Sequence, residues 1–352
     1  MKYSSIVFLL SKNPNNRDLK RFQINDFKKE IKVTLISLDG IINKSKAKNK
    51  STKDFISINT IAELDLILNP NNFLLLFFPF NKKTYGIHNI ITKKNIEYAY
   101  VSLGMQPSSL KSSYKSLIYK EVFGFNQKKP KYQFVGGSEN LFSKSNLLKD
   151  SKTQIVNTGS FDYVESITED QKKILNKDYF VFIDDMYESH PDYDTTLIKS
   201  SYYFNALNKI LKTYETKYNM ECIISLHPRS TNTRAKLFNF RVIENSTKNL
   251  IKHSEFTVFH FSTAINFSII YNKPIIQIDF DLSYKSNYYR GISKTFSEET
   301  NSNYLLESKG FENTSLNLDI INKEKYLSYK NKYLYFDSKD SVVKYVDYFR
   351  TL

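Results

Sequence analysis

Short apolar runs recur along this chain, and each ends close to a residue that forms loops. In the first half they cover residues 5–10, 32–38, 73–78, 97–102, 132–135 and 154–156. They are rich in Ile, Val, Phe and Tyr and lack polar alternation, as is typical of strands buried on both faces of a parallel sheet. Loop formers such as Gly40, Pro79 and Gly104 follow them. This order of strand, turn and helix predicts an α/β fold.

A second series of runs begins after a polar stretch, residues 161–177, which we expect to link two domains. It predicts strands at 179–183, 220–226, 241–243, 256–260 and 274–278, separated by helices at 200–216, 231–238, 247–253 and 263–271. The alternation predicts two doubly wound, Rossmann-like units facing a central cleft. We place an N-terminal domain at 1–165, a C-terminal domain at 178–335, and a returning helical segment at 336–352. The chain after residue 281 reads as irregular until a helix at 341–350.

Composition excludes several classes of protein. The length of 352 residues suits two domains, and 41% hydrophobic residues is too many for a disordered chain. The single cysteine, Cys222, excludes an internal disulfide and fits a reducing cytoplasm. The apolar stretch at residues 6–10 is shorter than the core of a signal peptide, so a first strand is expected there.

The formal net charge of +15 predicts anionic partners. Nucleic acid, an acidic lipid surface and a phosphorylated substrate all fit, although a codon preference for lysine would give the same balance. A nucleic-acid-binding module is therefore one alternative. It is disfavoured because the lysines are scattered and no nucleic-acid-recognition motif is present.

Polar residues follow three consecutive strands of the second series. Parallel strands bring their carboxyl ends to one edge of a sheet, where ligands of such folds bind. The residues in question are His227, Pro228 and Arg229, then Glu244, then Ser262 and Thr263.

Each residue has a chemical interpretation and a plain alternative. His227 can donate a hydrogen bond to a phosphate, with Pro228 fixing its loop and Arg229 adding charge, or it is a loop histidine bonded to backbone. Glu244 can accept hydrogen bonds from a ribose, or it is a solvated acid. Ser262 and Thr263 can bind an anion at a helix start, or they form an ordinary helix cap.

The ordered set "SLHPRS", "VIEN" and "FHFSTAINFSIIYNKPII" resembles the C-terminal domain of bacterial GT-B sialyltransferases and related CMP-sugar transferases, over about residues 179–280. The resemblance implies a GT-B enzyme that moves a sialic-acid-like sugar from CMP to a surface glycan of a capsule, lipooligosaccharide or O-antigen. It implies that His227 contacts the CMP phosphate and acts as an acid, that Glu244 binds the ribose, and that Ser262 and Thr263 hold the phosphate. It also implies that no metal or other cofactor is needed, and the histidines and cysteine show no metal-ligand spacing.

The catalytic base is where this sequence departs from those families, which carry an acid-acid-glycine motif. Here Asp39 precedes a glycine, whereas Asp184 and Asp185 precede a methionine. All three follow predicted strands, so the base stays open among them, with turn or capping roles as the alternatives. A second His-Pro pair, His190-Pro191, is a weaker candidate that could line the acceptor side.

Two further enzyme classes share a His-Pro pair and a downstream serine pair on GT-B folds. These are CDP-polyol phosphotransferases of the teichoic-acid type and Kdo transferases. In each case we expect acceptor contacts from N-terminal loops around Gly40, Pro79 and residues 104–109. We expect a cytoplasmic protein that lies peripherally on the anionic inner face of the cytoplasmic membrane, without nucleic-acid partners.

Overall fold

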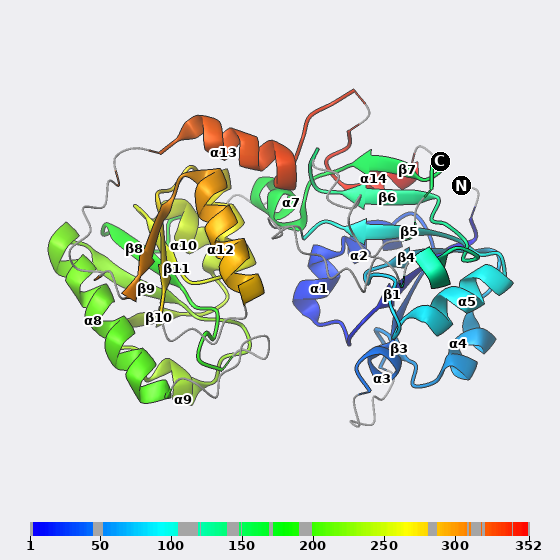
Figure 1. The fold of residues 1–352 in the computed structure, drawn as a ribbon, viewed down its shortest axis with the longest axis horizontal. Helices are drawn as coiled ribbons and strands as arrows, with labels where there is room; N and C mark the ends of the chain where they lie inside the picture. The colour runs from blue at the N-terminus through cyan, green and yellow to red at the C-terminus, as the bar shows by residue number, and fades with distance from the viewer. Residues whose placement is uncertain are drawn as a thin grey trace. The chain divides into compact units, whose positions relative to one another are not determined.

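The structure is a computed structural model that describes residues 3–44, 52–104, 119, 121–138, 148, 150–168, 172–189, 199–280, 287–307, 310, 318, 321–339 and 341–350, without the side chains of 287–290. The chain forms two compact units. Unit 1 comprises residues 1–105, 111–164 and 331–352, and unit 2 comprises 106–110 and 165–330. Figure 1 shows the two sheets with their helices.

Unit 1 is built on a parallel sheet with strand order β3-β2-β1-β4-β5-β6-β7. The strands are β1 (Ser5–Leu10), β2 (Val33–Ser37), β3 (Ile56–Ser57), β4 (Asn72–Leu76), β5 (Glu97–Ser102), β6 (Tyr132–Val135) and β7 (Gln154–Asn157). Its helices include α1 (Asn16–Arg21), α2 (Ile24–Lys28), α3 (Asp39–Ile42), α4 (Ile61–Ile67), α5 (Tyr85–Lys93) and α14 (Tyr345–Arg350), and α7 (Phe161–Thr168) begins in this unit.

Both faces of the first sheet are buried, as its apolar runs predict. Alternate residues of β1 enter different clusters: Val7 and Leu9 pack on one side, while Ile6, Phe8 and Leu10 pack on the other. The second cluster includes Tyr345, Val346 and Phe349 of α14, so the last helix completes the core of unit 1. The returning helix expected from the sequence therefore belongs to the N-terminal unit.

Unit 2 is built on a second parallel sheet with strand order β10-β9-β8-β11-β12-β13. The strands are β8 (Tyr179–Ile183), β9 (Glu221–Ser225), β10 (Arg241–Ile243), β11 (Thr257–Phe259), β12 (Ile275–Asp279) and β13 (Asn303–Leu306). The helices include α8 (Ser200–Tyr218), α9 (Asn232–Ala235), α10 (Thr247–His253), α11 (Asn266–Ile270), α12 (Asn287–Thr300) and α13 (Lys323–Tyr329), and a 3-10 turn, η3 (Thr263–Ile265), precedes α11.

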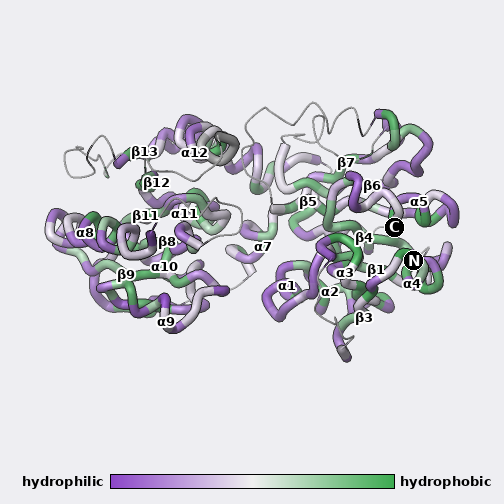
Figure 2. Tube along the Cα trace, turned by 60° about the horizontal axis from the view of Figure 1, so that its bottom comes forward, coloured by the Kyte–Doolittle hydropathy of each residue, from purple (hydrophilic) through white to green (hydrophobic). Residues whose placement is uncertain are grey.

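Hydropathy follows this architecture (Figure 2). Helix α8 alternates between hydrophobic and hydrophilic residues along its length. Its buried residues, which enter the core of unit 2, are Tyr203, Phe204, Leu207, Ile210, Leu211 and Tyr214. The expectation of an irregular chain after residue 281 is wrong, because α12, β13 and α13 lie there. Among the described residues, no helix is long and apolar enough to span a bilayer.

Candidate functional site

The carboxyl edge of the second sheet brings the predicted residues together by strand order. Strand β8 lies between β9 and β11, and β10 lies outside β9. His227 therefore lies in the loop after β9, and Glu244 follows the neighbouring strand β10. Ser262 follows β11, on the other side of β8. The strand order reverses between β8 and β11, which is where doubly wound sheets bind ligands.

Two aspartates at the end of β8 hold the flanking loops in place. The Asp184 Oδ2 accepts the backbone N–H of His227 at 3.1 Å, on the β9 side. The Asp185 Oδ2 accepts the backbone N–H of Phe261 at 2.9 Å, on the β11 side. Consecutive side chains of an extended segment point in opposite directions, so one dipeptide braces both loops.

Asp184 is also the centre of a buried ion-pair cluster. The Arg234 guanidinium donates to its two carboxylate oxygens at 2.6 and 2.8 Å, and to both oxygens of Glu188 at 2.6 and 2.8 Å. Burial alone would lower the pKa of Arg234, but the hydrogen bonds to Glu188 and Asp184 raise it above its ordinary value. The guanidinium carbon also lies 5.4 Å from the ring centroids of both Phe204 and Phe238.

This geometry argues against Asp184 and Asp185 as the catalytic base. The Asp184 side chain is 0% exposed, and its oxygens are already occupied by a guanidinium and backbone N–H groups. Asp185 is also buried, and it accepts from the Phe261 backbone. A general base must reach the hydroxyl that it deprotonates, whereas the contacts of these two carboxylates are with Arg234 and the backbone of the flanking loops. Arg234 is likewise buried in this cluster.

His227 is partly exposed and has a defined ring orientation. Its Nδ1 accepts the backbone N–H of Arg229 at 3.2 Å, and its carbonyl accepts the N–H of Ser230 at 2.8 Å. An imidazole that accepts at Nδ1 carries its proton at Nε2 when neutral. The neutral ring therefore carries its N–H at Nε2, and Pro228 and Arg229, which follow it, are exposed.

The remaining predicted residues of unit 2 lie at the same edge of the sheet. Glu244 is exposed at the end of β10. The Ser262 hydroxyl accepts the N–H of Ala264 at 3.3 Å and so caps η3, while Thr263 is exposed as its first residue. His260, which follows β11, is fully buried: its Nδ1 lies 2.8 Å from the Ile278 carbonyl oxygen and its Nε2 lies 3.0 Å from the Tyr203 hydroxyl.

Asp39 belongs to unit 1 and is more accessible than the other two aspartates. It is the first residue of α3, directly beyond β2, and is partly exposed. Its Oδ1 accepts from the Asn43 side chain at 2.7 Å. The second His-Pro pair, His190-Pro191, and residues 105–109 of the expected acceptor loop lie outside the described residues.

Unit 1 also carries a cavity that the sequence did not predict. It has a volume of about 280 Å³ and lies at the carboxyl ends of β1, β4 and β5, where the strand order of the first sheet reverses. Residues that line it include Ser11, Lys12, Asp18, Phe22, Phe77, Ser102, Gly104 and Phe161. Of the expected acceptor loops, only that at Gly104 contributes to this lining.

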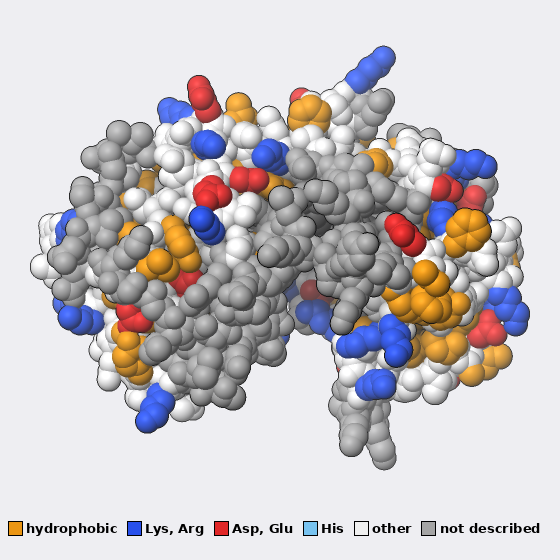
Figure 3. All heavy atoms as spheres, in the orientation of Figure 1, with side chains coloured by type: hydrophobic (Ala, Val, Ile, Leu, Met, Phe, Trp, Pro, Cys, Tyr) orange, Lys and Arg blue, Asp and Glu red, His pale blue; other side chains and the backbone are white. Residues whose placement is uncertain are grey.

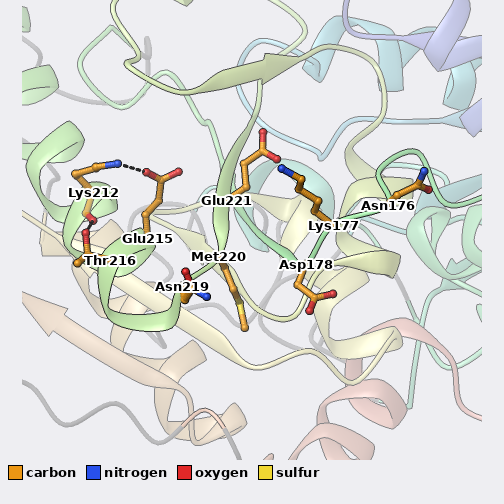
Figure 4. A pocket seen from close by; sticks show the side chains of 9 residues that line it. All are labelled: Asn176, Lys177, Asp178, Lys212, Glu215, Thr216, Asn219, Met220 and Glu221. Atoms are coloured by element: carbon orange, nitrogen blue, oxygen red, sulfur yellow. Dashed lines mark hydrogen bonds and ion pairs between the residues drawn. The ribbon is translucent and has the colours of Figure 1, made fainter.

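A larger surface pocket of unit 2, about 690 Å³, lies at the opposite edge of the sheet (Figure 4). Asp178 directly precedes β8, and Glu221 begins β9. Lys212 pairs with Glu215 at 2.8 Å, and Glu215 also accepts the Cys222 N–H at 2.9 Å. Doubly wound sheets bind ligands at the carboxyl edge, so we assign this pocket no role in the site. Among the described residues, no cluster of His, Cys, Asp and Glu could hold a metal ion.

Comparison with known proteins identifies the fold. No family model and no curated protein sequence matches the chain. A histidine-to-alanine variant of the wall teichoic acid polymerase TagF matches in structure with a TM-score of 0.55 at 14% identity, over 95% of this chain and 86% of that chain.

Two other solved structures share the architecture. The UDP-GlcNAc 2-epimerase from Methanocaldococcus jannaschii matches with a TM-score of 0.52 at 15% identity, over 96% of this chain and 94% of that chain. The calicheamicin glycosyltransferase CalG4 matches with a TM-score of 0.52 at 8% identity, over 94% of this chain and 96% of that chain. Together with the two parallel sheets, these likenesses confirm the predicted fold class: the chain has a GT-B fold of two Rossmann-like domains.

Proposed function

We propose that this protein is an inverting glycosyltransferase that moves a sialic-acid-like sugar from a CMP-activated donor to a hydroxyl of a surface glycan. The observation that carries the proposal is the loop of His227. Its backbone is bonded to the buried Asp184, and its ring is oriented so that the neutral form has a proton at Nε2. A fixed N–H donor at the carboxyl edge of a doubly wound sheet suits the phosphate of a leaving nucleotide.

Each residue of the edge then has one role. The His227 Nε2–H donates to the CMP phosphate and transfers its proton as the glycosidic C–O bond to phosphate breaks. Ser262 and Thr263 add hydroxyl groups for the same phosphate. Glu244 accepts from the ribose diol one strand spacing away, and Pro228 and Arg229 complete the loop.

We propose Asp39 as the general base, because Asp184 and Asp185 are buried and already bonded. Its carboxylate would take the proton of the acceptor hydroxyl while that oxygen forms the bond to the sugar. The electron pair of the bond that breaks passes to the phosphate, so no oxidation state changes, and the charge of the leaving phosphate is stabilised by protein donors in place of a metal. The acceptor would be a glycan or lipid-linked glycan at the anionic inner face of the cytoplasmic membrane, which the +15 charge favours.

A second candidate is a CDP-polyol phosphotransferase. The structural likeness to TagF, a wall teichoic acid polymerase, favours this reading. Both reactions expel a cytidine nucleotide, CMP in each case, and both would use a histidine at the phosphate. They differ in the group that is transferred, a sugar or a polyol phosphate. A Kdo transferase would also expel CMP and differs only in its sugar.

The test is a thermal-shift screen of the full chain against CMP, CDP, UMP, UDP and GDP, followed by CDP-glycerol. We expect CMP and CDP to stabilise unit 2 and the other nucleotides to have little effect. Saturation at 100 times Kd adds about 2.7 kcal/mol, which is roughly 5–10 °C for a domain of this size. Stabilisation by UMP or UDP alone would refute the CMP donor. CDP-glycerol binding tighter than that of CDP would favour the phosphotransferase.

A further inference from the structure

Three large apolar side chains of unit 1 are exposed within a stretch of four residues of the chain. Val122 is 64% exposed, Phe123 is 47% exposed and Phe125 is 81% exposed. Single exposed apolar residues are ordinary on protein surfaces, but a cluster of this kind marks a site of contact with a membrane or a protein. We call residues 122, 123 and 125 the apolar patch.

The segment that contains the apolar patch is hydrogen-bonded to α5. The Gln127 Nε2 donates to the Asn89 Oδ1 at 2.6 Å, and the Lys128 backbone N–H donates to the Thr92 Oγ1 at 2.9 Å. The Phe123 ring lies 5.9 Å from the ring of Tyr85. Tyr85, Asn89 and Thr92 are spaced by four and three residues and therefore lie on one face of α5, which is the face that this segment contacts.

A lysine closes the turn on which the most exposed ring lies. The Lys129 ammonium donates to the carbonyls of Gly124 at 2.6 Å and Phe125 at 3.0 Å. These bonds order the backbone while the Phe125 ring itself remains in solvent. The exposure of the ring is therefore a property of a bonded turn.

Lysines occur in the two chain segments that meet at the Tyr85 and Phe123 rings. Lys82 and Lys83 are exposed in the turn before Tyr85, and Lys128 and Lys129 follow the patch along the chain. Glu121 is the acidic residue of this segment. Figure 3 shows hydrophobic side chains gathered over the part of unit 1 that carries α4 and α5, with lysine or arginine side chains beside them.

We propose that the apolar patch docks unit 1 onto an anionic phospholipid surface. The phenyl rings enter the boundary between head groups and acyl chains, and Lys82 and Lys83 remain at the level of the phosphates. Rings flanked by lysines match such a surface in both polarity and charge. The inference deepens the proposed function, which needs access to a membrane acceptor, but it rests on this surface alone.

The test is co-sedimentation of the purified full chain with vesicles. Phosphatidylglycerol–phosphatidylcholine vesicles are compared with vesicles of phosphatidylcholine alone. We expect binding to the anionic vesicles that weakens as salt is added. The variant Val122→Ser/Phe125→Ser should bind at least about tenfold more weakly, because two apolar side chains no longer enter the bilayer. Lys82→Glu/Lys83→Glu should lose the preference for anionic lipid.

The matched control is Leu327→Ser in unit 2, where a leucine of α13 is 57% exposed. It should bind vesicles like the wild type. Equal vesicle binding by the patch variant, or no binding by the wild type, would overturn the proposal. So would a dimer in light scattering that the patch variant abolishes while vesicle binding is absent, since the patch would then contact a second copy. The nucleotide thermal shift, measured on the same variants without vesicles, tests the proposed function separately.

Discussion

The Arg234 cluster gives a sharp test of how the site is held. In Arg234→Met the side chain keeps a similar size and its contact with Phe204 and Phe238, but Asp184 and Glu188 lose their shared partner. Breaking a buried ion pair on one side costs about 3–5 kcal/mol. For a domain the size of unit 2 this lowers the unfolding midpoint by roughly 6–20 °C.

In this variant the carboxylates of Asp184 and Glu188 face each other in the core without a cation, and a buried charge without a partner is costly. Adding Glu188→Gln removes one of the two charges and should therefore recover part of the unfolding midpoint.

Cys222 provides the assay, because it is buried in unit 2 and the chain has no other cysteine. Burial raises the pKa of its thiol well above the ordinary value, so a thiol reagent should react only when unit 2 opens. Labelling against temperature then reports unit 2 without a contribution from unit 1. Arg229→Met, an exposed arginine five residues earlier, is the control and should leave the curve unchanged. A midpoint for Arg234→Met within about 2 °C of the wild type would refute the reasoning.

Three further outcomes are expected. His227→Ala should abolish transfer with an unchanged Cys222 labelling curve, and Glu244→Ala should mainly weaken CMP binding. Glu221→Ala, at the opposite edge of the sheet, is the control. Wild-type turnover in both site variants would rule out the proposed site. Burial lowers the pKa of His88 to about 4, whereas the unfolded pKa is about 6.5. The buried neutral ring therefore contributes stability to unit 1 above about pH 6.5, and this stability is lost as the pH falls towards 4. An NMR titration that shows protonation of His88 near pH 6.5 would contradict this prediction. Gly137→Ala should destabilise unit 1 by about 1–3 kcal/mol, because an added Cβ would lie 2.4 Å from the Lys332 backbone. In Gly104→Ala the nearest atom would be 3.8 Å from the added Cβ, so the free energy of unfolding, measured in urea, should stay close to the wild-type value.

The sequence predicted most of the sheets because their strands are buried on both faces. An apolar run without polar alternation identifies a strand such as β1 or β8 without knowledge of its neighbours. Strand β13 escaped detection because it lies at the edge of its sheet and is only partly buried, so its apolar run is limited to Tyr304, Leu305 and Leu306. Helices α12 and α13 contain many polar residues, so their apolar faces were not recognised from the sequence.

The sequence alone also placed His227, Glu244 and Ser262 at one edge, since parallel strands end on the same side of a sheet. It could not distinguish an accessible carboxylate from a buried one. Asp184 and Arg234 are fifty positions apart, and only the packing of α9 against the end of β8 removes the aspartate from solvent and bonds it to the arginine. Local sequence thus determined which residues end the strands. Tertiary contacts decided that Asp184 and Asp185 are buried and bonded to the loops after β9 and β11, because burial and pairing depend on neighbours that are distant in the chain.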